Sequence, residues 1–450
     1  MFTHSDAVGF QSCLNSKVAK EHARDVSTFF DDLFMYSPTT MALNYRWYRR
    51  LRCSCSKSIK YTRMKNILKR LKYPCALILF AFAISACDDW FDDDDDDHDD
   101  TKNIGRTFAK GLDTPWEMQF APDGSLFLSQ RPGIISIVDA SGNAKPWLRL
   151  DSVVEEVGES GLFGIALDPD YQSNHYVYFG YTYASQISPI ELTNKIVRYK
   201  NDDGKPVFDK VLLDNIRGNH LHNVGAFEFG PDEMLYVTVG EVFAPALAQD
   251  KSSLNGKILR MTRDGGVPDD NPIAGSYIFS LGHRNPQGLA FQPGTGNLFS
   301  TEHGPSEQQG CCMDEINLIQ AGHNYGWPLI RGSQQQAGLE TPVYHSGDTT
   351  TWAPTGGIFL VHGEWKGSML FTGLRGQALY RVVFKSDDAT QIDKVERYLY
   401  RALGRLRNVA EGPDGKIYVA VSNQDGRGDP LTIDDRIVVF DQKEVRQYAD

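Results

Sequence analysis

Two arginines two positions apart, Arg405 and Arg407, lie in the segment GRLRNV near the C-terminal end of the chain. Along a β-strand, residues i and i+2 project from the same face, so both guanidinium groups would point in one direction. A planar guanidinium can bind a carboxylate or a phosphate through two hydrogen bonds. The pair therefore predicts a small polyanionic ligand, although surface salt bridges are the ordinary alternative for two such arginines taken alone.

A histidine and a carboxylate predict acid–base chemistry in the middle of the chain. The segment GNHLHNVG contains His220 and His222, which can share a strand face, and Glu241 ends the following strand in YVTVGE. One interpretation is a general base, His222, that Glu241 orients and makes more basic. The other is a metal site made of two histidines and one carboxylate. These residues alone leave both interpretations open.

Other segments supply hydrogen-bond donors for an oxygen that gains negative charge, and carbonyl ligands for a cation. GHRNPQG contains Arg284 and Asn285, which are both hydrogen-bond donors, and TGLRGQALY adds a further cation, Arg375. Carbonyl-rich turns at 302–305 and 324–328 offer the hard oxygen ligands that Ca²⁺ prefers. These segments extend the predicted site beyond the two arginines and the histidine.

The elements that must position these residues recur from about residue 105 onward. A Gly- or Pro-containing turn followed by an aliphatic–aromatic strand occurs six times, with the aromatic residues at Phe127, Tyr178, Tyr236, Phe299, Phe371 and Tyr418. Six units of this length predict an all-β fold, a six-bladed β-propeller with four-stranded antiparallel blades. A large β-sandwich is the alternative, but it would not repeat its turn chemistry six times. Loops at one end of such a ring would build the site.

The residues before the repeats have the layout of a targeting segment. Residues 64–86 begin with Met64, contain four Lys and Arg, and become apolar from Ala76, over a run too short to span a bilayer. The final residues, ISAC, resemble a bacterial lipobox and predict a lipid anchor on Cys87. The protein would then face the periplasm or the surface in a bacterial cell envelope. An ordinary signal peptide or a short buried helix is the alternative.

This interpretation divides the chain into four parts, of which residues 64–86 are the lipoprotein signal peptide. Residues 1–63 precede a complete signal peptide, so we interpret them as an over-extended N-terminus rather than a domain. Residues 87–104 form a solvated tether, because ten of the thirteen residues after the cysteine are Asp. Residues 105–445 form the propeller domain.

Charge and cysteine content exclude several classes of function. The formal net charge is −12, and residues 1–86 are net basic, so the remainder is more acidic than the whole; a nucleic-acid partner is not expected. Of the seven cysteines, four precede Cys87, and no CxxCH haem motif or paired CxxC zinc motif is present. Cys311 and Cys312, in the segment SEQQGCCM at 306–313, form either a vicinal disulfide or two thiols.

Eight segments in register resemble the glucose/sorbosone dehydrogenase family, the soluble PQQ-dependent aldose sugar dehydrogenases. The resemblance covers about residues 105–442, and the segments read SGLFGIALDPDY, HNVGAFEFGPD, LNGKILRMTRDGGVPDDNPI, LGHRNPQGLAFQP, STEHGP, DEINLIQAGHNYGWP, APTGG and GRLRNV. The resemblance implies a six-bladed propeller that oxidises an aldose at C1 to the aldonolactone by hydride transfer to C5 of PQQ. It also implies Ca²⁺ as a second cofactor, and a separate cytochrome or quinone as electron acceptor, because no haem motif is present.

The resemblance assigns catalytic roles to His222, Glu241 and Arg284, and a cofactor contact to Asn285. His222 falls on the general base that takes the proton of the sugar's C1 hydroxyl, and Glu241 falls on its carboxylate partner. Arg284 and Asn285 fall on residues that contact the quinone oxygens, with Arg284 stabilising charge at the C5 oxygen.

The remaining assignments concern cofactor and metal binding. Arg405 and Arg407 match the arginines that hold PQQ carboxylates, and Arg375 stands where the best-known soluble glucose dehydrogenases have Lys. Glu159 stands where those enzymes have a Gln near the quinone, and so adds a carboxylate beside an anionic cofactor. The calcium assignments are the carbonyls of Gly304 and Pro305 for the ion at PQQ, and Glu315 with Tyr325 for a second, structural ion.

Two alternatives come from other classes of function. A metal-dependent, lactonase-like hydrolase on a six-bladed propeller would use His220, His222 and Glu241 on one metal, but it has no need for several arginines facing one cavity. A propeller that only binds a partner is the second alternative. The segment 427–429, RGD, we interpret as a chance match.

Overall fold

The computed structural model describes residues 104–187, 190–305 and 311–450. The predictions for residues 1–63 and 64–86, for Cys87 and for nearly all of the tether lie outside these residues. None of the short helices in the described part has the length and apolarity needed to traverse a bilayer.

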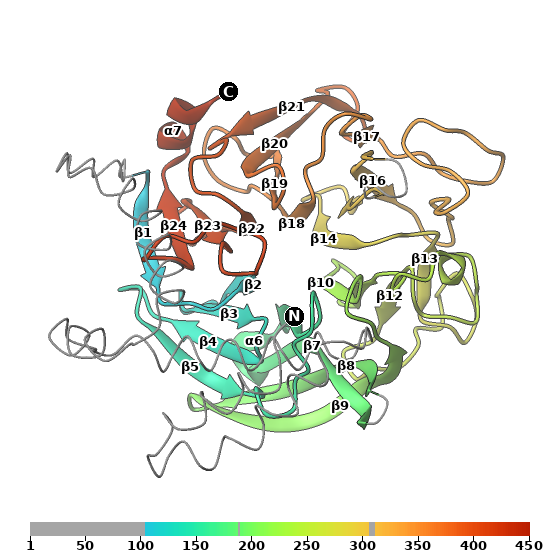
Figure 1. Ribbon diagram of the computed structural model, residues 1–450, viewed down its shortest axis with the longest axis horizontal. Helices are drawn as coiled ribbons and strands as arrows, with labels where there is room; N and C mark the ends of the chain where they lie inside the picture. The colour runs from blue at the N-terminus through green and yellow to red at the C-terminus, as the bar shows by residue number, and fades with distance from the viewer. Residues whose placement is uncertain (1–103, 188–189, 306–310) are drawn as a thin grey trace, which may run out of the picture. The chain divides into compact units, whose positions relative to one another are not determined.

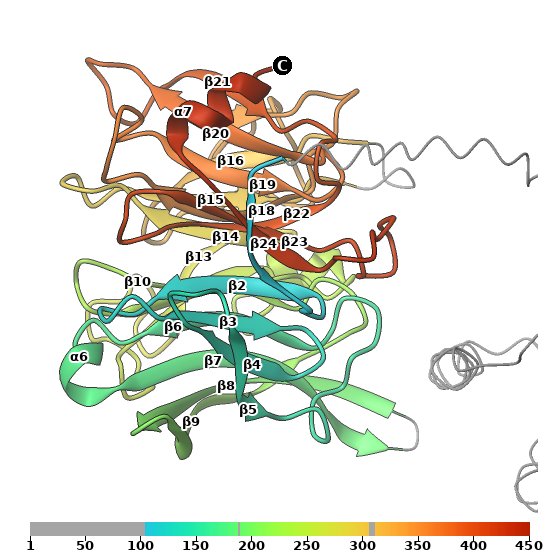
Figure 2. The same cartoon turned by 90° about the vertical axis from the view of Figure 1, so that its left-hand side faces the viewer.

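Six four-stranded antiparallel sheets form a six-bladed β-propeller, which confirms the predicted fold (Figure 1). The first blade contains β2 (Pro115–Phe120), β3 (Leu126–Gln130), β4 (Ile134–Val138) and β5 (Ala144–Arg149). The second contains β6 (Leu162–Leu167), β7 (Tyr176–Ile187), β8 (Ile190–Asp202) and β9 (Lys205–Arg217), whose long ribbons lie in the lower half of Figure 2. The third contains β10 (Val224–Phe229), β11 (Leu235–Val239), β12 (Lys257–Met261) and β13 (Ile278–Leu281).

The other three blades follow the same order along the chain. The fourth contains β14 (Pro286–Phe291), β15 (Leu298–Glu302), β16 (Glu315–Ile319) and β17 (Tyr344–His345). The fifth contains β18 (Pro354–Phe359), β19 (Met369–Gly373), β20 (Ala378–Phe384) and β21 (Ile392–Tyr398). The sixth contains β22 (Leu406–Glu411), β23 (Ile417–Val421), β24 (Arg436–Phe440) and β1 (Arg106–Lys110). Within the described residues, four short helices connect or follow strands: α6 (Tyr171–Asn174), η1 (Pro245–Ala248), α7 (Gln442–Val445) and η3 (Arg446–Tyr448).

The aromatic residue of every predicted repeat lies in the second strand of a blade. Each of the six is buried, because the second strand has a neighbour on both sides and a blade against each face. These residues are Phe127 in β3, Tyr178 in β7, Tyr236 in β11, Phe299 in β15, Phe371 in β19 and Tyr418 in β23. The repeat therefore marks the same position in every blade.

The ring is closed by strands from both ends of the propeller. β1 pairs antiparallel with β24, with Arg106 opposite Val439 and Lys110 opposite Arg436. The sixth blade therefore takes its outermost strand from the start of the propeller and its other three from the end. The sequence repeats did not predict this pairing, because β1 lies before the first repeated turn.

Each inner strand has an irregular start at the same end of the ring. The pairing between the first and second strand of every blade contains a register shift near the first residues of the inner strand, for example between Pro286 and Gly288 and between Leu406 and Asn408. Bulges of this kind turn side chains away from the regular alternation of a strand. They recur where the predicted site residues lie.

Candidate active site

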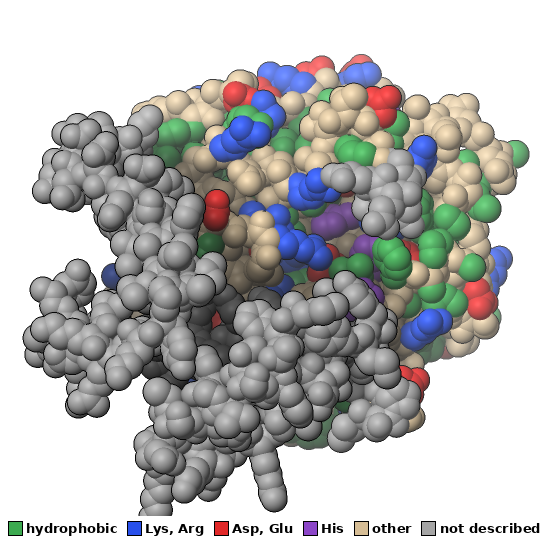
Figure 3. Space-filling view, in the orientation of Figure 1, with side chains coloured by type: hydrophobic (Ala, Val, Ile, Leu, Met, Phe, Trp, Pro, Cys, Tyr) green, Lys and Arg blue, Asp and Glu red, His purple; other side chains and the backbone are tan. Residues whose placement is uncertain are grey.

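The predicted catalytic and cofactor-binding residues gather at one end of the propeller. They lie in the loops before an inner strand or after a second strand, or, for Arg407, at the start of the inner strand β22; these positions meet at the same end because the two strands are antiparallel. Lys, Arg and His side chains cluster near the centre of the face seen in Figure 3. Glu159, Glu241 and Glu302 all act electrostatically on the Arg284 guanidinium, and Glu159 also acts on Arg407. These charges therefore belong to one site.

His222 and Glu241 form a buried pair on the third blade. The imidazole Nδ1 lies 2.6 Å from the Glu241 Oε1, and the two side chains are 8% and 0% exposed. A carboxylate at Nδ1 holds the proton there and leaves the lone pair on Nε2. This contact has the geometry that orientation of a general base by Glu241 requires.

The local backbone around His222 differs from the prediction. His220 and His222 do not share a strand face, since β10 begins at Val224 and His222 has a left-handed φ of 54°. His220 is exposed, whereas His222 is buried. The described residues contain no group of three His, Cys, Asp or Glu side chains arranged to hold a metal ion. The hydrolase alternative requires His220 beside His222 and Glu241, and this arrangement is not found.

Gly240 allows the His222 backbone to approach the loop that carries Glu241. A Cβ on Gly240 would lie 2.5 Å from the His222 carbonyl oxygen and 2.9 Å from Asn285 Oδ1. The amide of Val242 donates to the same His222 oxygen at 3.1 Å. A glycine is therefore required here by close contact with backbone.

We expect Gly240→Ala to displace His222, lowering both stability and turnover. Overpacking of this kind costs about 1–3 kcal/mol of unfolding free energy. Urea denaturation and steady-state kinetics of the same variant would measure the two effects. Gly266→Ala is a matched control, because its Cβ would meet only the Thr262 side chain, at 3.1 Å. Equal stability and turnover in Gly240→Ala and wild type would contradict the role of this contact.

Glu302 fixes the position of Arg284. Its carboxylate accepts a hydrogen bond from the Arg284 backbone amide and lies 2.9 Å from His283 Nδ1. The Arg284 guanidinium is buried and lies 5.5 Å above the ring of Trp327. Burial lowers the pKa of Arg284, and the nearby carboxylates Glu241 and Glu302 oppose this shift. A cation is thus held in a desolvated place beside the His222–Glu241 pair.

His303 is a site residue that the sequence did not single out. Its Nε2 lies 3.0 Å from the Pro354 carbonyl oxygen, and its Nδ1 lies 3.5 Å from Asn285 Nδ2. Burial, together with the charges of Arg284 and Arg407, lowers its pKa to about 3 despite the opposing charge of Glu159. His303 is therefore a neutral ring at neutral pH. His303 lies in the turn 302–305, which the sequence analysis considered only for its carbonyl oxygens. This position could have indicated that His303 belongs to the site.

Arg405 and Arg407 are both buried at the start of β22. Arg405 donates from Nε to Asp425 Oδ2 at 2.7 Å and from Nη1 to the Leu374 carbonyl at 3.3 Å, which brings it next to the turn that carries the exposed Arg375. Only Arg407 is in the regular strand, and the bulge between Leu406 and Asn408 intervenes. Strand alternation, from which the pair was predicted to face one way, therefore does not describe this segment.

Arg407 carries an unsatisfied donor. Its guanidinium stacks 3.3 Å above the Trp116 ring, and Nη2 donates to Gln287 Oε1 at 2.9 Å. Its Nε is buried and has no hydrogen-bond partner in the described part of the chain. Burial lowers the Arg407 pKa to about 9. An anionic ligand would satisfy the donor and favour the charged form.

Glu159 faces the same site and forms an ion pair that the sequence did not predict. Its Oε1 lies 2.6 Å from Nη1 of Arg427, in the segment interpreted as a chance match. Its backbone amide donates to the His220 carbonyl at 2.7 Å. Burial alone would raise the Glu159 pKa, but Arg427 and His222 outweigh burial and lower it to about 2. Glu159 is therefore a carboxylate at neutral pH.

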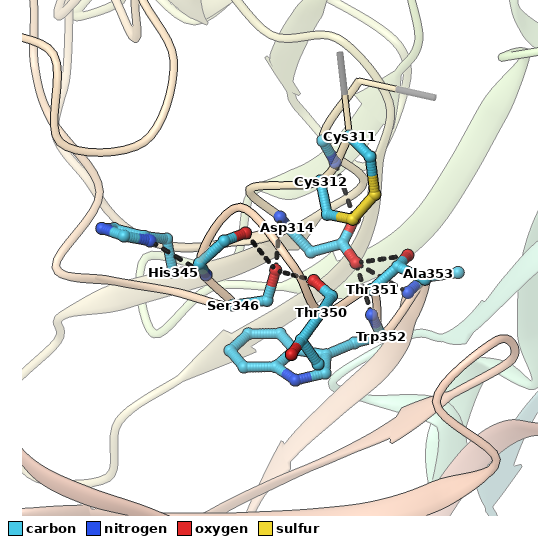
Figure 4. The surroundings of a disulfide bond; sticks show 11 residues. Cys311, Cys312, Asp314, His345, Ser346, Thr350, Thr351, Trp352 and Ala353 are labelled. Carbon is cyan, nitrogen blue, oxygen red and sulfur yellow. Dashed lines mark hydrogen bonds between the residues drawn. A yellow bond between two sulfur atoms is a disulfide. The ribbon is translucent and has the colours of Figure 1, made fainter. Parts of the chain in front are cut away.

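Asp314 holds the predicted calcium loop in place, and Figure 4 shows its carboxylate hydrogen-bonded to the segment that contains Trp352 and Ala353. Its Oδ1 accepts from the Gly304 amide at 2.8 Å, and its Oδ2 accepts from the amides of Trp352 and Ala353 at 2.5 and 2.9 Å. Cys311 and Cys312 form a disulfide just before it. A Cβ on Gly304 would lie 1.9 Å from the Cys312 carbonyl oxygen, so the two segments are in close contact. Cys311 and Cys312 thus lie against the Gly304–Pro305 turn.

The residues predicted for a second calcium ion have other partners. The Glu315 carboxylate accepts from the Gly332 amide at 3.0 Å and from Asn317 Nδ2 at 3.2 Å. The Tyr325 hydroxyl donates to the Leu318 carbonyl at 2.5 Å, and its ring stacks on His283. Burial and the neighbouring Glu302 raise the Glu315 pKa to about 8. Their side chains are thus engaged within the fourth blade and its loops.

Comparison with known proteins places this architecture in a family. The family model described as Glucose / Sorbosone dehydrogenase matches residues 112–433. The chain belongs to the glucose/sorbosone dehydrogenase family. This assignment confirms the resemblance found in the eight segments. The protein is a sugar dehydrogenase of the glucose/sorbosone dehydrogenase family.

Individual relatives span most of this family member. A structure of the PQQ-bound aldose sugar dehydrogenase from Streptomyces coelicolor is 38% identical, covering 74% of this chain and 96% of that one, with a TM-score of 0.66. Aldose sugar dehydrogenase YliI of Escherichia coli is 28% identical, covering 70% of this chain and 89% of its own length. Quinoprotein glucose dehydrogenase B of Acinetobacter calcoaceticus is 33% identical over 53% of this chain and 55% of its own length.

Proposed function

We propose that the protein oxidises an aldose at C1 to the aldonolactone, with PQQ as cofactor. The observation that carries this proposal is a buried His–Glu pair in the same site as buried Arg284, Arg405 and Arg407. An acid–base pair facing several cations suits a reaction in which a sugar loses a proton and a hydride next to an anionic cofactor. The PQQ-bound relative from Streptomyces coelicolor supports the choice of cofactor.

The residues present fit a quinone that carries carboxylates. The buried Arg407 Nε lacks a partner, and a carboxylate oxygen would supply one. Arg405 and Arg407 would hold carboxylates, while Arg284 and Asn285 would donate to quinone oxygens. Arg375, at the turn beside Arg405, would add a further cation. When bound, PQQ would supply the electrophilic carbon that accepts the hydride.

His222 is the residue to which we assign proton removal. Because Nδ1 faces Glu241, Nε2 is the nitrogen able to take the proton of the C1 hydroxyl. Glu241 would hold the neutral ring in this tautomer before proton transfer and would stabilise the imidazolium that forms after it. Arg284, held through its backbone by Glu302, would favour negative charge on the quinone oxygen nearby.

The Gly304–Pro305 turn fits a calcium ion at the cofactor. Backbone carbonyls are ligands of the type that Ca²⁺ prefers, and the hydrogen bond from the Gly304 amide to Asp314 restrains their direction. Burial raises the pKa of Asp314, so a nearby cation would favour its charged form. We assign the second, structural ion to the vicinity of Glu315 and Tyr325 from the family resemblance alone.

Reconstitution tests the proposed function. We expect purified apo protein to be inert in dye-linked aldose oxidation and to become active with PQQ plus Ca²⁺, because the cofactor supplies the hydride acceptor. EDTA added before PQQ should prevent activation. Full activity without added or copurifying PQQ would contradict the proposal. Activation that EDTA does not affect would remove Ca²⁺ from it and leave PQQ in place.

We also propose where the electrons go and where the enzyme works. Since the sequence has no attached-haem motif, a separate cytochrome or quinone would reoxidise the cofactor. The lipobox-like segment before Cys87 supports a lipid anchor at the bacterial cell envelope, with the Asp-rich tether between anchor and propeller.

A further inference from the structure

We propose that Arg427 is a cofactor-positioning residue: it neutralises Glu159, so that a carboxylate can face an anionic cofactor without repelling it. This inference rests on the proposed PQQ-dependent function. It gives a role to Arg427, the cation of the RGD segment, and accounts for the presence of the Glu159 carboxylate in the site.

The ion pair joins two loops that are distant in sequence. Glu159 precedes β6 in the second blade, whereas Arg427 lies between β23 and β24 in the sixth. The Arg427 Nη1 is 2.6 Å from Glu159 Oε1, and the two side chains are 55% and 25% exposed. The first blade lies between the second and the sixth in the ring. The ion pair therefore joins loops of two blades that are not neighbours, at the end of the propeller that carries the site.

The loop that carries Arg427 is held in place by buried groups. The Asn423 amide donates to Asp435 Oδ1 at 2.7 Å, and the Arg427 amide donates to Asp425 Oδ1 at 2.9 Å. Asp425 in turn pairs with Arg405 through its other oxygen. A Cβ on Gly428 would lie 2.9 Å from Arg405 Cδ, so this loop packs directly on a proposed cofactor ligand. Arg427 therefore lies on a loop that packs against the residues of the candidate active site.

Without Arg427, the Glu159 carboxylate would compete with an anionic cofactor for the cations of the site. Its charge acts on Arg284, Arg407 and His303, which we assign to the cofactor side of the site. Like charges brought together in a partly desolvated site repel each other by more than they would in water. With Arg427 present the Glu159–Arg427 pair is neutral, and the buried arginines remain available to the cofactor.

A set of variants distinguishes this role from a surface ion pair. PQQ binding would be measured by fluorescence or absorbance titration of apo protein in the presence of Ca²⁺, without any turnover. We expect Arg427→Ala to weaken PQQ binding about 10-fold or more, which corresponds to about 1.4 kcal/mol. Arg427→Lys should retain most of the affinity. Arg446→Ala, which breaks the exposed pair with Glu364, is the matched control and should bind PQQ like wild type.

The double variant decides the mechanism. If Arg427 acts by neutralising Glu159, then Glu159→Gln combined with Arg427→Ala should restore PQQ affinity to within about threefold of wild type, since the repulsive charge is gone. Unchanged affinity in Arg427→Ala, or a double variant as weak as that single variant, would overturn the inference. Wild-type protein that fails to bind PQQ would instead refute the proposed function itself. The double variant also controls for misfolding. It contains the same Arg427→Ala substitution as the single variant, so restored PQQ binding would show that this substitution does not unfold the protein.

Discussion

His222→Gln should lower aldose turnover by about 10²–10⁴-fold while PQQ still binds. Glutamine keeps a polar side chain of similar reach but cannot take up a proton, so proton removal is left to water. The buried contact between His222 Nδ1 and Glu241 is the basis of this expectation. Single-turnover measurement of cofactor reduction, beside a PQQ binding titration, separates the chemical step from cofactor affinity.

His220→Gln is the matched control for this variant. His220 lies two residues away, but its side chain is exposed and has no place in the proposed acid–base pair. We expect its turnover to equal that of wild type. Equal loss in both variants, together with release of a stoichiometric transition metal, would favour the hydrolase alternative. Full turnover in His222→Gln would exclude this histidine as the base.

Arg407→Lys should weaken PQQ binding by about 10–100-fold, with little change in the KM for sugar. Lysine keeps the charge, but it cannot stack flat on Trp116 and donate both to Gln287 and to a carboxylate. Hydrogen bonds to charged groups contribute about 1.5–3 kcal/mol, and each 1.4 kcal/mol is a factor of ten. Titration of the apo variant with PQQ, followed by kinetics at saturating PQQ, measures both constants.

Arg381→Lys provides the comparison for Arg407→Lys. Arg381 also lies over a tryptophan, with its guanidinium 4.8 Å from the Trp365 ring, and it pairs with Glu396 in the fifth blade. The chemical change is the same, but its partners are outside the candidate active site. We expect its PQQ affinity to match wild type. Unaltered affinity in Arg407→Lys as well would mean that the buried donor of Arg407 is not used by the cofactor.

Local sequence patterns predicted the blades, but they did not predict contacts between segments that are far apart in the sequence. A turn followed by an aromatic residue in a buried strand is defined within about ten residues, so all six second strands could be located. The pairing of β1 with β24 joins the two ends of the propeller and leaves no periodic mark. The same limit applies to the Glu159–Arg427 contact, since neither segment indicates the other.

The sequence was enough to propose which residue types belong to the candidate site. It was not enough to predict the direction of their side chains, which depends on the backbone geometry. His222, Glu241 and Arg284 were located by type and by segment, and the structure brings them together. The strand alternation assumed for the histidines was wrong, because a left-handed residue precedes β10. For the arginine pair, the alternation is interrupted by a bulge at the start of β22. Alternation is a property of regular strands, and site residues lie where strands begin irregularly.

The shared sixth blade sets the order in which the propeller can be completed during synthesis. β24 remains an unpaired sheet edge until it meets β1, and that meeting closes a loop spanning all five other blades. Contacts of such long sequence separation form late and slowly. An unfinished ring therefore exposes a strand edge able to pair with other chains. Aggregation during production should accordingly be most sensitive to changes in β1 and β24 rather than in the catalytic loops.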